Sequence, residues 1–375
     1  MYVRRLYLRN YRNYTEIDLE FKKGVNIIIG PNAQGKTNLL ESIYFLSTGT
    51  SHRAGRDSEL IKWSADSFTL KAVVFSHGRF HEVQIDYTGK KNITVDGVPL
   101  NRLSELLGIT NVVLFSPDDL QLVKGSPGLR RRFMNICISR VSPLYRENLI
   151  EYDRILTQRN NLLRDDGWGR SGLSKRLQEN LEVWDEQLIR IGSNMILKRA
   201  MVLSEMSEYA KEVHKAITSS RENLVISYEP SFEIKDFSKE GIASGFMKRL
   251  TAMRGVEIRR GVTMIGPHRD DLKISINDVN ARVYGSQGQQ RTSVLSLKLA
   301  ELKYLKNESG EYPILLLDDV MSELDESRRN YLLNFIDGEL QTFITTTDIT
   351  GFKNCFNGSL AIFSFCEGKL QMEIL

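Results

Sequence analysis

Residues 30–37 contain glycines, a lysine and a threonine at a spacing suited to binding phosphate. The segment GPNAQGKT matches the pattern G-x-x-x-x-G-K-[ST], follows the apolar run VNIII and precedes TNLLESIYFL, a stretch typical of a helix. The glycines of such a turn let backbone amides approach phosphate oxygens, and the start of the helix adds partial positive charge. The segment is therefore predicted to bind the phosphates of a nucleotide.

Two side chains of this segment have distinct expected roles. Lys36 would reach the β- and γ-phosphates of ATP, and the hydroxyl of Thr37 would bind Mg²⁺. The predicted ATP contacts in this segment are Gly30, Pro31, Asn32, Ala33, Gln34, Gly35, Lys36 and Thr37.

Another segment, PILLLDD at 313–319, has the composition of a buried strand that ends in two carboxylates. At the end of such a strand Asp318 would lie beside the phosphate-binding turn and bind Mg²⁺, directly or through water. Asp319 would point elsewhere and activate the attacking water. Lys36, Asp318 and Asp319 are the predicted catalytic residues, and Thr37 and Asp318 are the predicted metal ligands.

The segment GSQGQQR at 285–291 resembles another phosphate-binding turn that opens a helix. Its predicted nucleotide contacts are Ser286, Gln287, Gly288 and Gln289. If its helix packs on the lobe that contains residues 30–37, its N-terminus would lie far from the nucleotide bound there. A second copy related by a two-fold axis would bring the two half-sites together. We therefore predict an ATP-dependent homodimer.

Basic side chains cluster at several positions, although the formal net charge is only +4. The candidates for DNA contact are Arg130, Arg131, Arg132, Lys198 and Arg199. The alternative for each cluster is a solvated face with salt bridges. Because the sequence contains no base-reading motif, DNA contacts are expected to go mainly to phosphates.

The pattern of apolar residues along the chain changes twice, which predicts three parts. Residues 1–117 are rich in alternating and continuous apolar runs and are predicted to form an ATPase lobe. Residues 118–262 have a helical pattern, with one face of 173–220 lined by apolar residues, and residues 263–375 return to α/β texture. LKISI and ARVY are predicted strands. The helical part is either an arm projecting from the lobe or a helix packed on it.

Composition excludes some classes of protein. No run of about 18 apolar residues is present, so no membrane-spanning helix is expected, and the N-terminus does not have the pattern of a signal peptide. The three cysteines are scattered, which fits a reducing cytoplasm rather than a disulfide framework or a zinc site. The predicted location is cytoplasmic.

The phosphate-binding turn, SQGQ, ILLLDD and SELD together resemble the ABC-type ATPase heads of the SMC and Rad50 class. More closely, the chain is similar to the RecF family of bacterial recombination mediators. That resemblance includes LRNYRNY (8–14), SPDDLQLVKGSPGLRRRFMN (116–135), GPHRDDL (266–272) and YGSQGQQR (284–291). It implies an α/β fold, an ABC-type P-loop ATPase head with an inserted helical arm.

The resemblance also implies a function. It implies a weak, DNA-stimulated ATPase whose ATP-induced dimer clamps DNA at gaps and at double-strand to single-strand junctions. RecO and RecR would be its partners in loading recombinase, in support of replication and the SOS response. It implies that residues 286–289 act on the nucleotide of the second copy and that Asp318 and Asp319 are the Walker B pair.

Some residues depart from the expected pattern, and other classes of protein remain open. ITTTD (344–348) has no histidine where many ABC ATPases do, so Thr347 or Asp348 would replace it, or hydrolysis is slow; Asn135 stands where an aspartate is expected. Arg53 is a candidate for contact with phosphate or DNA, and His268 is expected to be a structural hydrogen-bond partner. The alternatives are an SMC-like tether, a transporter ATPase subunit and a small-molecule kinase.

Overall fold

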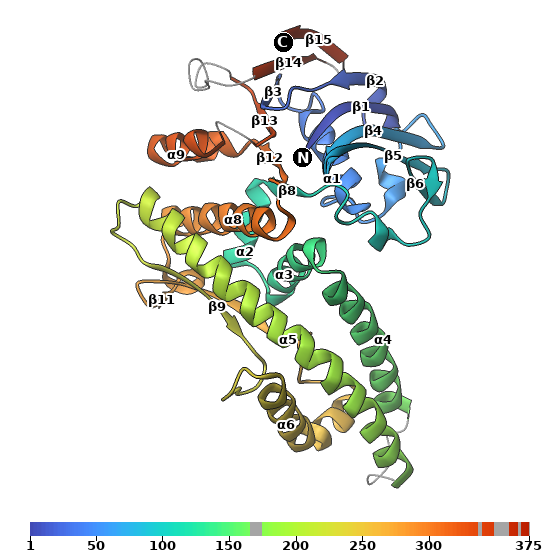
Figure 1. The fold of residues 1–375 in the computed structure, drawn as a ribbon, viewed down its shortest axis with the longest axis vertical. Helices are drawn as coiled ribbons and strands as arrows, with labels where there is room; N and C mark the ends of the chain where they lie inside the picture. The colour runs from blue at the N-terminus through green and yellow to red at the C-terminus, as the bar shows by residue number, and fades with distance from the viewer. Residues whose placement is uncertain (166–174, 337–339, 349–359, 367–368, 375) are drawn as a thin grey trace. The chain divides into compact units, whose positions relative to one another are not determined.

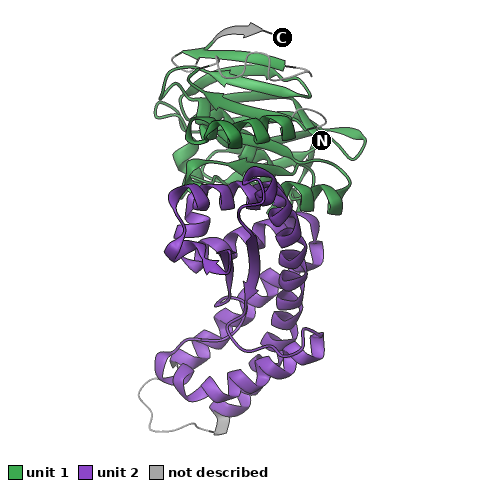
Figure 2. Ribbon diagram, turned by 90° about the vertical axis from the view of Figure 1, so that its left-hand side faces the viewer, with its two compact units in different colours: residues 1–119, 301–375 green, residues 120–300 purple. Residues whose placement is uncertain are grey.

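The structure is a computed structural model that describes residues 1–165, 175–336, 340–348, 360–366 and 369–374. The chain forms two compact units, which Figure 2 shows in different colours. Unit 1 contains residues 1–119 and 301–375, and unit 2 contains residues 120–300. Unit 2 thus extends past residue 262, the predicted end of the helical part, because the strand Asp271–Ile276 pairs with the strand Leu224–Glu229 and contacts the helix Pro127–Val141.

The first sheet of unit 1 is antiparallel, with strand order β2-β1-β4-β5-β6-β7 (Figure 1). Its strands are β1 (Tyr2–Tyr11), β2 (Tyr14–Glu20), β4 (Phe68–Ser76), β5 (Arg79–Tyr87), β6 (Lys91–Val95) and β7 (Val98–Pro99). Buried and solvent-facing residues largely alternate along β2 and β4, as in sheets with one face on a core.

The second sheet of unit 1 is mostly parallel, with strand order β15-β14-β3-β13-β12-β8. Its strands are β3 (Val25–Ile29), β8 (Val112–Phe115), β12 (Ile314–Asp318), β13 (Thr342–Thr346), β14 (Leu360–Cys366) and β15 (Lys369–Ile374). The strands β8, β12 and β13 are buried at every position, which explains their continuous apolar or threonine-rich runs.

Helix α1 (Lys36–Thr48) packs against β8, β12 and β13 and also contacts β4 of the first sheet. Leu39, Leu40 and Ile43 of this helix belong to one hydrophobic core with residues of both sheets. Unit 1 also contains helix α9 (Glu326–Ile336) and the 3-10 turns η1 (Asp57–Leu60), η2 (Leu103–Glu105), η3 (Pro117–Leu120) and η4 (Val320–Glu323).

Unit 2 is dominated by helices and has a small antiparallel sheet of order β11-β10-β9. Its helices are α2 (Gln121–Lys124), α3 (Pro127–Val141), α4 (Pro143–Asp165), α5 (Lys175–Ile217), α6 (Lys239–Arg260) and α7 (Ala281–Tyr284). Its strands are β9 (Leu224–Glu229), β10 (Asp271–Ile276) and β11 (Val279–Asn280). Helix α8 (Gln287–Ser309) begins in unit 2 and ends in unit 1.

The tetrapeptide ARVY was wrongly predicted to be a strand, because it forms α7. The side chain of Asn280 accepts a hydrogen bond from the backbone amide of Arg282, which is the cap that starts a helix. Four residues are too few for periodicity to distinguish a strand from a helix turn.

The 43 residues of α5 form one helix, which is about 65 Å long at 1.5 Å per residue. Within unit 2 it packs against α4, α6 and β9. Gly192 is its only glycine, and a Cβ atom there would lie 2.8 Å from the Phe246 ring and 3.1 Å from the Tyr152 ring. Glycine at this position therefore permits the close approach of the three long helices.

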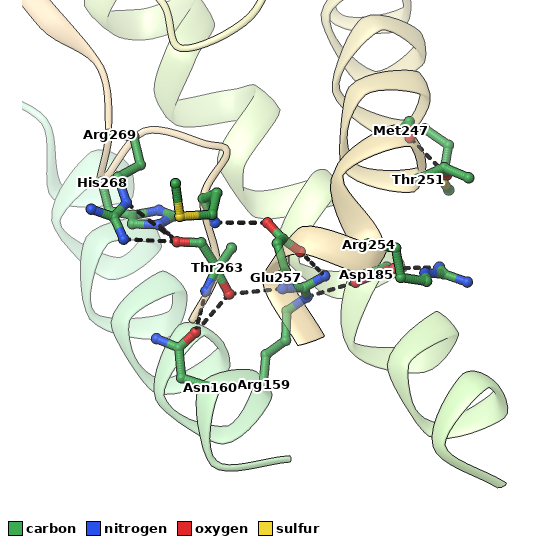
Figure 3. A network of polar contacts seen from close by, with 11 residues as sticks. Arg159, Asn160, Asp185, Met247, Thr251, Arg254, Glu257, Thr263, His268 and Arg269 are labelled. Carbon is green, nitrogen blue, oxygen red and sulfur yellow. Dashed lines mark hydrogen bonds and ion pairs between the residues drawn. The ribbon is translucent and has the colours of Figure 1, made fainter. Parts of the chain in front are cut away.

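A buried polar network joins these helices (Figure 3). Arg159 of α4 is fully buried and donates from Nε to Asp185 of α5 at 2.7 Å and from Nη2 to Glu257 of α6 at 2.8 Å. Its Nη1 donates to the Thr263 hydroxyl at 2.8 Å. One guanidinium thus holds three helices and the loop after α6, with its donors paired as burial requires.

The segment GPHRDDL is tied to the same loop. His268 donates from Nε2 to the Thr263 carbonyl oxygen at 3.1 Å and accepts at Nδ1 from the Tyr152 hydroxyl at 2.8 Å (Figure 3 shows the first contact). Burial lowers the pKa of the His268 imidazole to about 4, so the ring is neutral at neutral pH. His268 is a structural hydrogen-bond partner.

Candidate nucleotide-binding site

The segment 30–37 connects the end of β3 to the start of α1, and both of its glycines are required by their surroundings. Gly35 has φ of 99°, and a Cβ atom on it would lie 2.4 Å from Nδ2 of Asn13. A Cβ atom on Gly30 would lie 2.5 Å from the carbonyl oxygen of Phe365 in β14. Strand, turn and helix therefore have the arrangement that the phosphate-binding motif needs.

The amine of Lys36 lies against the turn itself. Nζ donates to the carbonyl oxygens of Gly30 at 2.6 Å and Pro31 at 2.8 Å. Burial lowers the pKa of Lys36, and the nearby charges of Asp319 and Asp318 act in the opposite direction. The cation of the turn and the two acids at the end of β12 thus share one electrostatic environment.

The two predicted metal ligands meet directly. The hydroxyl of Thr37 donates to Oδ1 of Asp318 at 2.9 Å, across 281 residues of sequence. The parallel order β3-β13-β12 places the carboxyl ends of these strands at one edge of the sheet, where ligands of open α/β sheets bind.

Asp318 and Asp319 are adjacent but occupy different environments. Asp318 is buried, whereas Asp319 is exposed and has a left-handed backbone with φ of 54°. The hydroxyl of Ser322 donates to the backbone oxygen of Asp319 at 2.7 Å and lies 3.3 Å from its Oδ1. A left-handed non-glycine residue is a costly conformation that is held by its surroundings.

Sequence inspection missed a third residue of this cluster. The hydroxyl of Thr345 in β13 lies 2.9 Å from Oδ1 of Asp318 and accepts a hydrogen bond from the backbone amide of Asp319 at 2.9 Å. Thr345 pairs with Asp318 in the register of β12 and β13. Once ILLLDD and TFITT are treated as neighbouring parallel strands, their aligned ends would indicate this contact.

The segment LRNYRNY braces the turn from the other side. The amide of Asn13 donates to the Gln34 carbonyl oxygen at 3.3 Å and accepts from Asn38 of α1 at 2.8 Å. Arg12 makes two hydrogen bonds of 2.8 Å to the carboxylate of buried Glu41. Burial opposes ionisation of Glu41, but bonds from Arg12 and Ser51 outweigh it and lower its pKa.

Three further residues that were considered as candidates from the sequence are exposed on unit 1. Arg53 is exposed, and its Nη1 lies 3.5 Å from Oδ1 of Asn38, the residue after Thr37. Thr347 and Asp348 are exposed just after β13. Residues 349–359, which follow them, lie outside the described part of the chain.

The segment 286–289 lies in unit 2 and forms a reciprocal helix cap at the start of α8. The hydroxyl of Ser286 accepts from the Gln289 amide at 3.2 Å, and Oε1 of Gln289 accepts from the Ser286 amide at 2.9 Å. Ser286 and Gln287 are exposed, and Gly288 and Gln289 are half-buried. The segment thus presents a serine hydroxyl at an ordered helix N-terminus.

Comparison with known proteins places this site in a family. The family model described as RecF/RecN/SMC N terminal domain matches residues 2–368. The DNA replication and repair protein RecF of Clostridium tetani is 44% identical over 371 residues, which cover 98% of this chain and 99% of that protein. The chain belongs to the RecF family. The protein of the same name from Halalkalibacterium halodurans is 42% identical over 375 residues, the whole of both chains.

Solved structures of similar fold agree with this family assignment. A structure described as the recombination mediator protein RecF with ATP in the RecFOR pathway has 37% identity and a TM-score of 0.89, over 100% of this chain and 98% of that one. An Smc head domain derived from Pyrococcus furiosus has 16% identity and a TM-score of 0.57, over 100% and 96%, and supports the fold alone. The predicted α/β head of ABC type is confirmed.

Two of the predicted DNA contacts are buried in this RecF-family chain, which corrects the prediction. Arg130 is 4% exposed and makes two hydrogen bonds of 2.7 Å to the carboxylate of Asp271. Arg199 is 1% exposed and donates to the Tyr145 hydroxyl at 2.8 Å and the Pro267 carbonyl oxygen at 2.6 Å. These guanidiniums hold unit 2 together, and in this conformation they do not reach a DNA phosphate.

The other three cations remain at or near the surface. Arg132 is exposed, and Lys198 is half-buried. Arg131 is half-buried and donates to the backbone oxygen of Asp270 at 2.9 Å. Within the part of this chain that the structure describes, every helix is too short or too polar to span a membrane.

Asn135, where the RecF pattern led us to expect aspartate, has a clear structural role. Its Oδ1 accepts hydrogen bonds from the Tyr145 hydroxyl and from Nη2 of Arg199, both at 2.8 Å. An amide oxygen supplies the acceptor that both donors need, and it does so without a second negative charge on Arg199, whose Nη1 already lies 3.9 Å from Oδ2 of Asp270.

Proposed function

We propose that this RecF-family chain is an ATP-dependent DNA-binding protein of recombinational repair. The observation on which this depends most is the 2.9 Å contact between Thr37 and Asp318, because it joins the phosphate-binding turn to an acidic strand end. The relative described as bound to ATP spans this whole chain at 37% identity, which supports ATP as the nucleotide. The phosphates would lie against the amides of residues 30–37, with Lys36 offsetting their charge.

The same cluster suits Mg²⁺. Mg²⁺ prefers oxygen ligands and is usually bound by one or two protein groups together with phosphates and water. The Thr37 hydroxyl and the Asp318 carboxylate supply such oxygens, and Thr345 orients the carboxylate. When bound, the ion would offset charge on the phosphate oxygens, while exposed Asp319 would take a proton from the attacking water.

The second half-site is proposed to act between two copies. Ser286 is exposed at the N-terminus of α8, where its hydroxyl and nearby amides suit a γ-phosphate. Ser286, Gln287, Gly288 and Gln289 of one chain would cover the ATP bound to the other. ATP binding would then favour the dimer, and hydrolysis would open it.

The DNA site is proposed for the basic surface of unit 2. With Arg130 and Arg199 assigned to the interior, Arg132 and Lys198 are the main candidates, with Arg131 secondary. Contacts to phosphate would be insensitive to sequence. In the proposed role the dimer clamps DNA at gaps or junctions in the cytoplasm and acts with RecO and RecR in loading recombinase. Its weak ATPase would serve as a switch that supports replication and the SOS response.

The nucleotide assignment is tested by calorimetry with Lys36→Met. Loss of the amine leaves phosphate charge uncompensated, so ATP binding is expected to fall below detection while the thermal unfolding midpoint stays near that of wild type. The matched control is Lys90→Met, an exposed lysine of the same unit. Unchanged ATP affinity in Lys36→Met would refute the assignment.

A further inference from the structure

The segment Ser286–Gln289 is connected to the end of the long helix α5 by side-chain hydrogen bonds. Nε2 of Gln289 donates to Oε1 of Glu222 at 3.0 Å, and Oε2 of Glu222 accepts from Nε2 of His214 at 3.0 Å. His214 is the fourth residue from the end of α5, and Glu222 lies between α5 and β9. All of these residues are in unit 2.

The imidazole of His214 also contacts α8 directly. The ring is fully buried, and its Nδ1 lies 3.2 Å from the hydroxyl of Ser296. With Nε2 donating to Glu222, a neutral ring accepts at Nδ1, so the donor on this side is the Ser296 hydroxyl, which also lies 2.8 Å from the Thr292 carbonyl oxygen. Helix α5 therefore contacts α8 about two turns beyond the cap and, through Glu222, at the cap itself.

The carboxylate of Glu222 decides which way the Gln289 amide faces. An ionised carboxylate is an acceptor only, so the NH₂ group of Gln289 must point toward Glu222. That orientation aims Oε1 at the Ser286 amide, which it meets at 2.9 Å. Without the carboxylate, either end of the amide could face Ser286, and only one end completes the cap.

We propose that Glu222 is a positioning residue that holds Gln289, and through it Ser286, in the arrangement needed to contact the nucleotide of a second copy. The inference rests on the proposed role of residues 286–289 between two chains. Because the same carboxylate also accepts from His214, a displacement of the end of α5 would change the cap of α8. Glu222 thus links the longest helix of unit 2 to the ATP-dependent contact.

The experiment compares full-length Glu222→Ala and Glu222→Gln with Glu208→Ala, an exposed glutamate on α5. Hydrogen exchange of the amides in 284–291 reports the cap, a fluorescent ATP analogue reports binding to unit 1, and light scattering with ATP and Mg²⁺ reports dimerisation. Glu222→Ala is expected to exchange faster at Ser286 and to dimerise about tenfold more weakly, the scale of one lost charged hydrogen bond. Analogue affinity should remain within about twofold of wild type.

Glu222→Gln keeps the shape of the side chain and should lie between Glu222→Ala and wild type, whereas Glu208→Ala should match wild type. Wild-type dimerisation by Glu222→Ala overturns the proposal, and so does weaker dimerisation without faster exchange at Ser286. Ser286→Arg separates the two levels of the argument. If Ser286→Arg also dimerises normally, the proposed contact between chains is itself wrong; if only Ser286→Arg is defective, the role of Glu222 is wrong.

Discussion

Asp318 and Asp319 are neighbours in sequence, yet the hydroxyl of Thr345 contacts different groups of the two residues. That hydroxyl contacts the side chain of Asp318 and accepts from the backbone of Asp319. Thr345→Val removes both contacts at nearly constant volume, so Mg²⁺-dependent ATP affinity should fall by about tenfold, the scale of one or two lost buried hydrogen bonds. Titration of ATP binding with Mg²⁺ measures this.

Thr342→Val is the matched control for that substitution. Thr342 is also buried in β13, but its hydroxyl has no hydrogen-bond partner in the described structure. It should bind ATP as wild type does. Equal affinities for Thr345→Val and Thr342→Val would show that the hydroxyl of Thr345 has no positioning role.

Two arginines that are almost adjacent in sequence should behave in opposite ways. Arg130→Ala leaves Asp271 without its buried partner and should destabilise unit 2 by about 3 kcal/mol, as broken buried ion pairs do. Arg132→Ala should leave the unfolding midpoint unchanged and lower the salt slope of DNA binding by about 0.9 if it contacts one phosphate. Thermal unfolding and fluorescence anisotropy over a salt series measure the two effects, and an unchanged slope would remove Arg132 from the DNA site.

The loop between α6 and β10 should make the stability of unit 2 depend on pH. Burial lowers the pKa of His268 from 6.5 to about 4, so below pH 6.5 the unfolded chain takes up a proton that the folded chain excludes. Stability is therefore lost as pH falls from 6.5 towards 4, by at most about 3 kcal/mol.

His268→Gln tests this directly, since a glutamine can donate to Thr263 and accept from Tyr152 without titrating. The loss of urea midpoint between about pH 7 and about pH 5 should be smaller in the variant than in wild type. Equal losses would mean that His268 does not contribute to the acid sensitivity of the unit.

Elements differed in how far the sequence could predict them. VNIII and ILLLD form the predicted central strands β3 and β12, because continuous apolar runs are typical of strands buried on both faces. ARVY was mistaken for a strand because the cap at Asn280 outweighs a four-residue pattern. The long helix predicted within 173–220 is α5, whose periodic apolar face is long enough to be unambiguous.

The site was partly predictable for a different reason. A phosphate-binding turn and an acidic strand end are local patterns, so Thr37 and Asp318 could be chosen before their contact was known. The burial of Arg130 and Arg199 depends on acceptors far away in sequence, among them Asp271 and Pro267. A run of basic residues in the sequence does not identify those acceptors, so charge alone led to the prediction that both arginines are exposed.

The whole-molecule claim is that ATP joins two copies through Ser286. Static light scattering of wild type and Ser286→Arg, with and without ATP and Mg²⁺, tests it most directly. Wild type should change from the 43.0 kDa monomer to twice that mass with ATP, while Ser286→Arg should bind ATP yet remain a monomer because the larger cation blocks the approach to the second copy. A wild-type chain that stays at monomer mass with saturating ATP, or a Ser286→Arg variant that doubles its mass normally, would contradict the account.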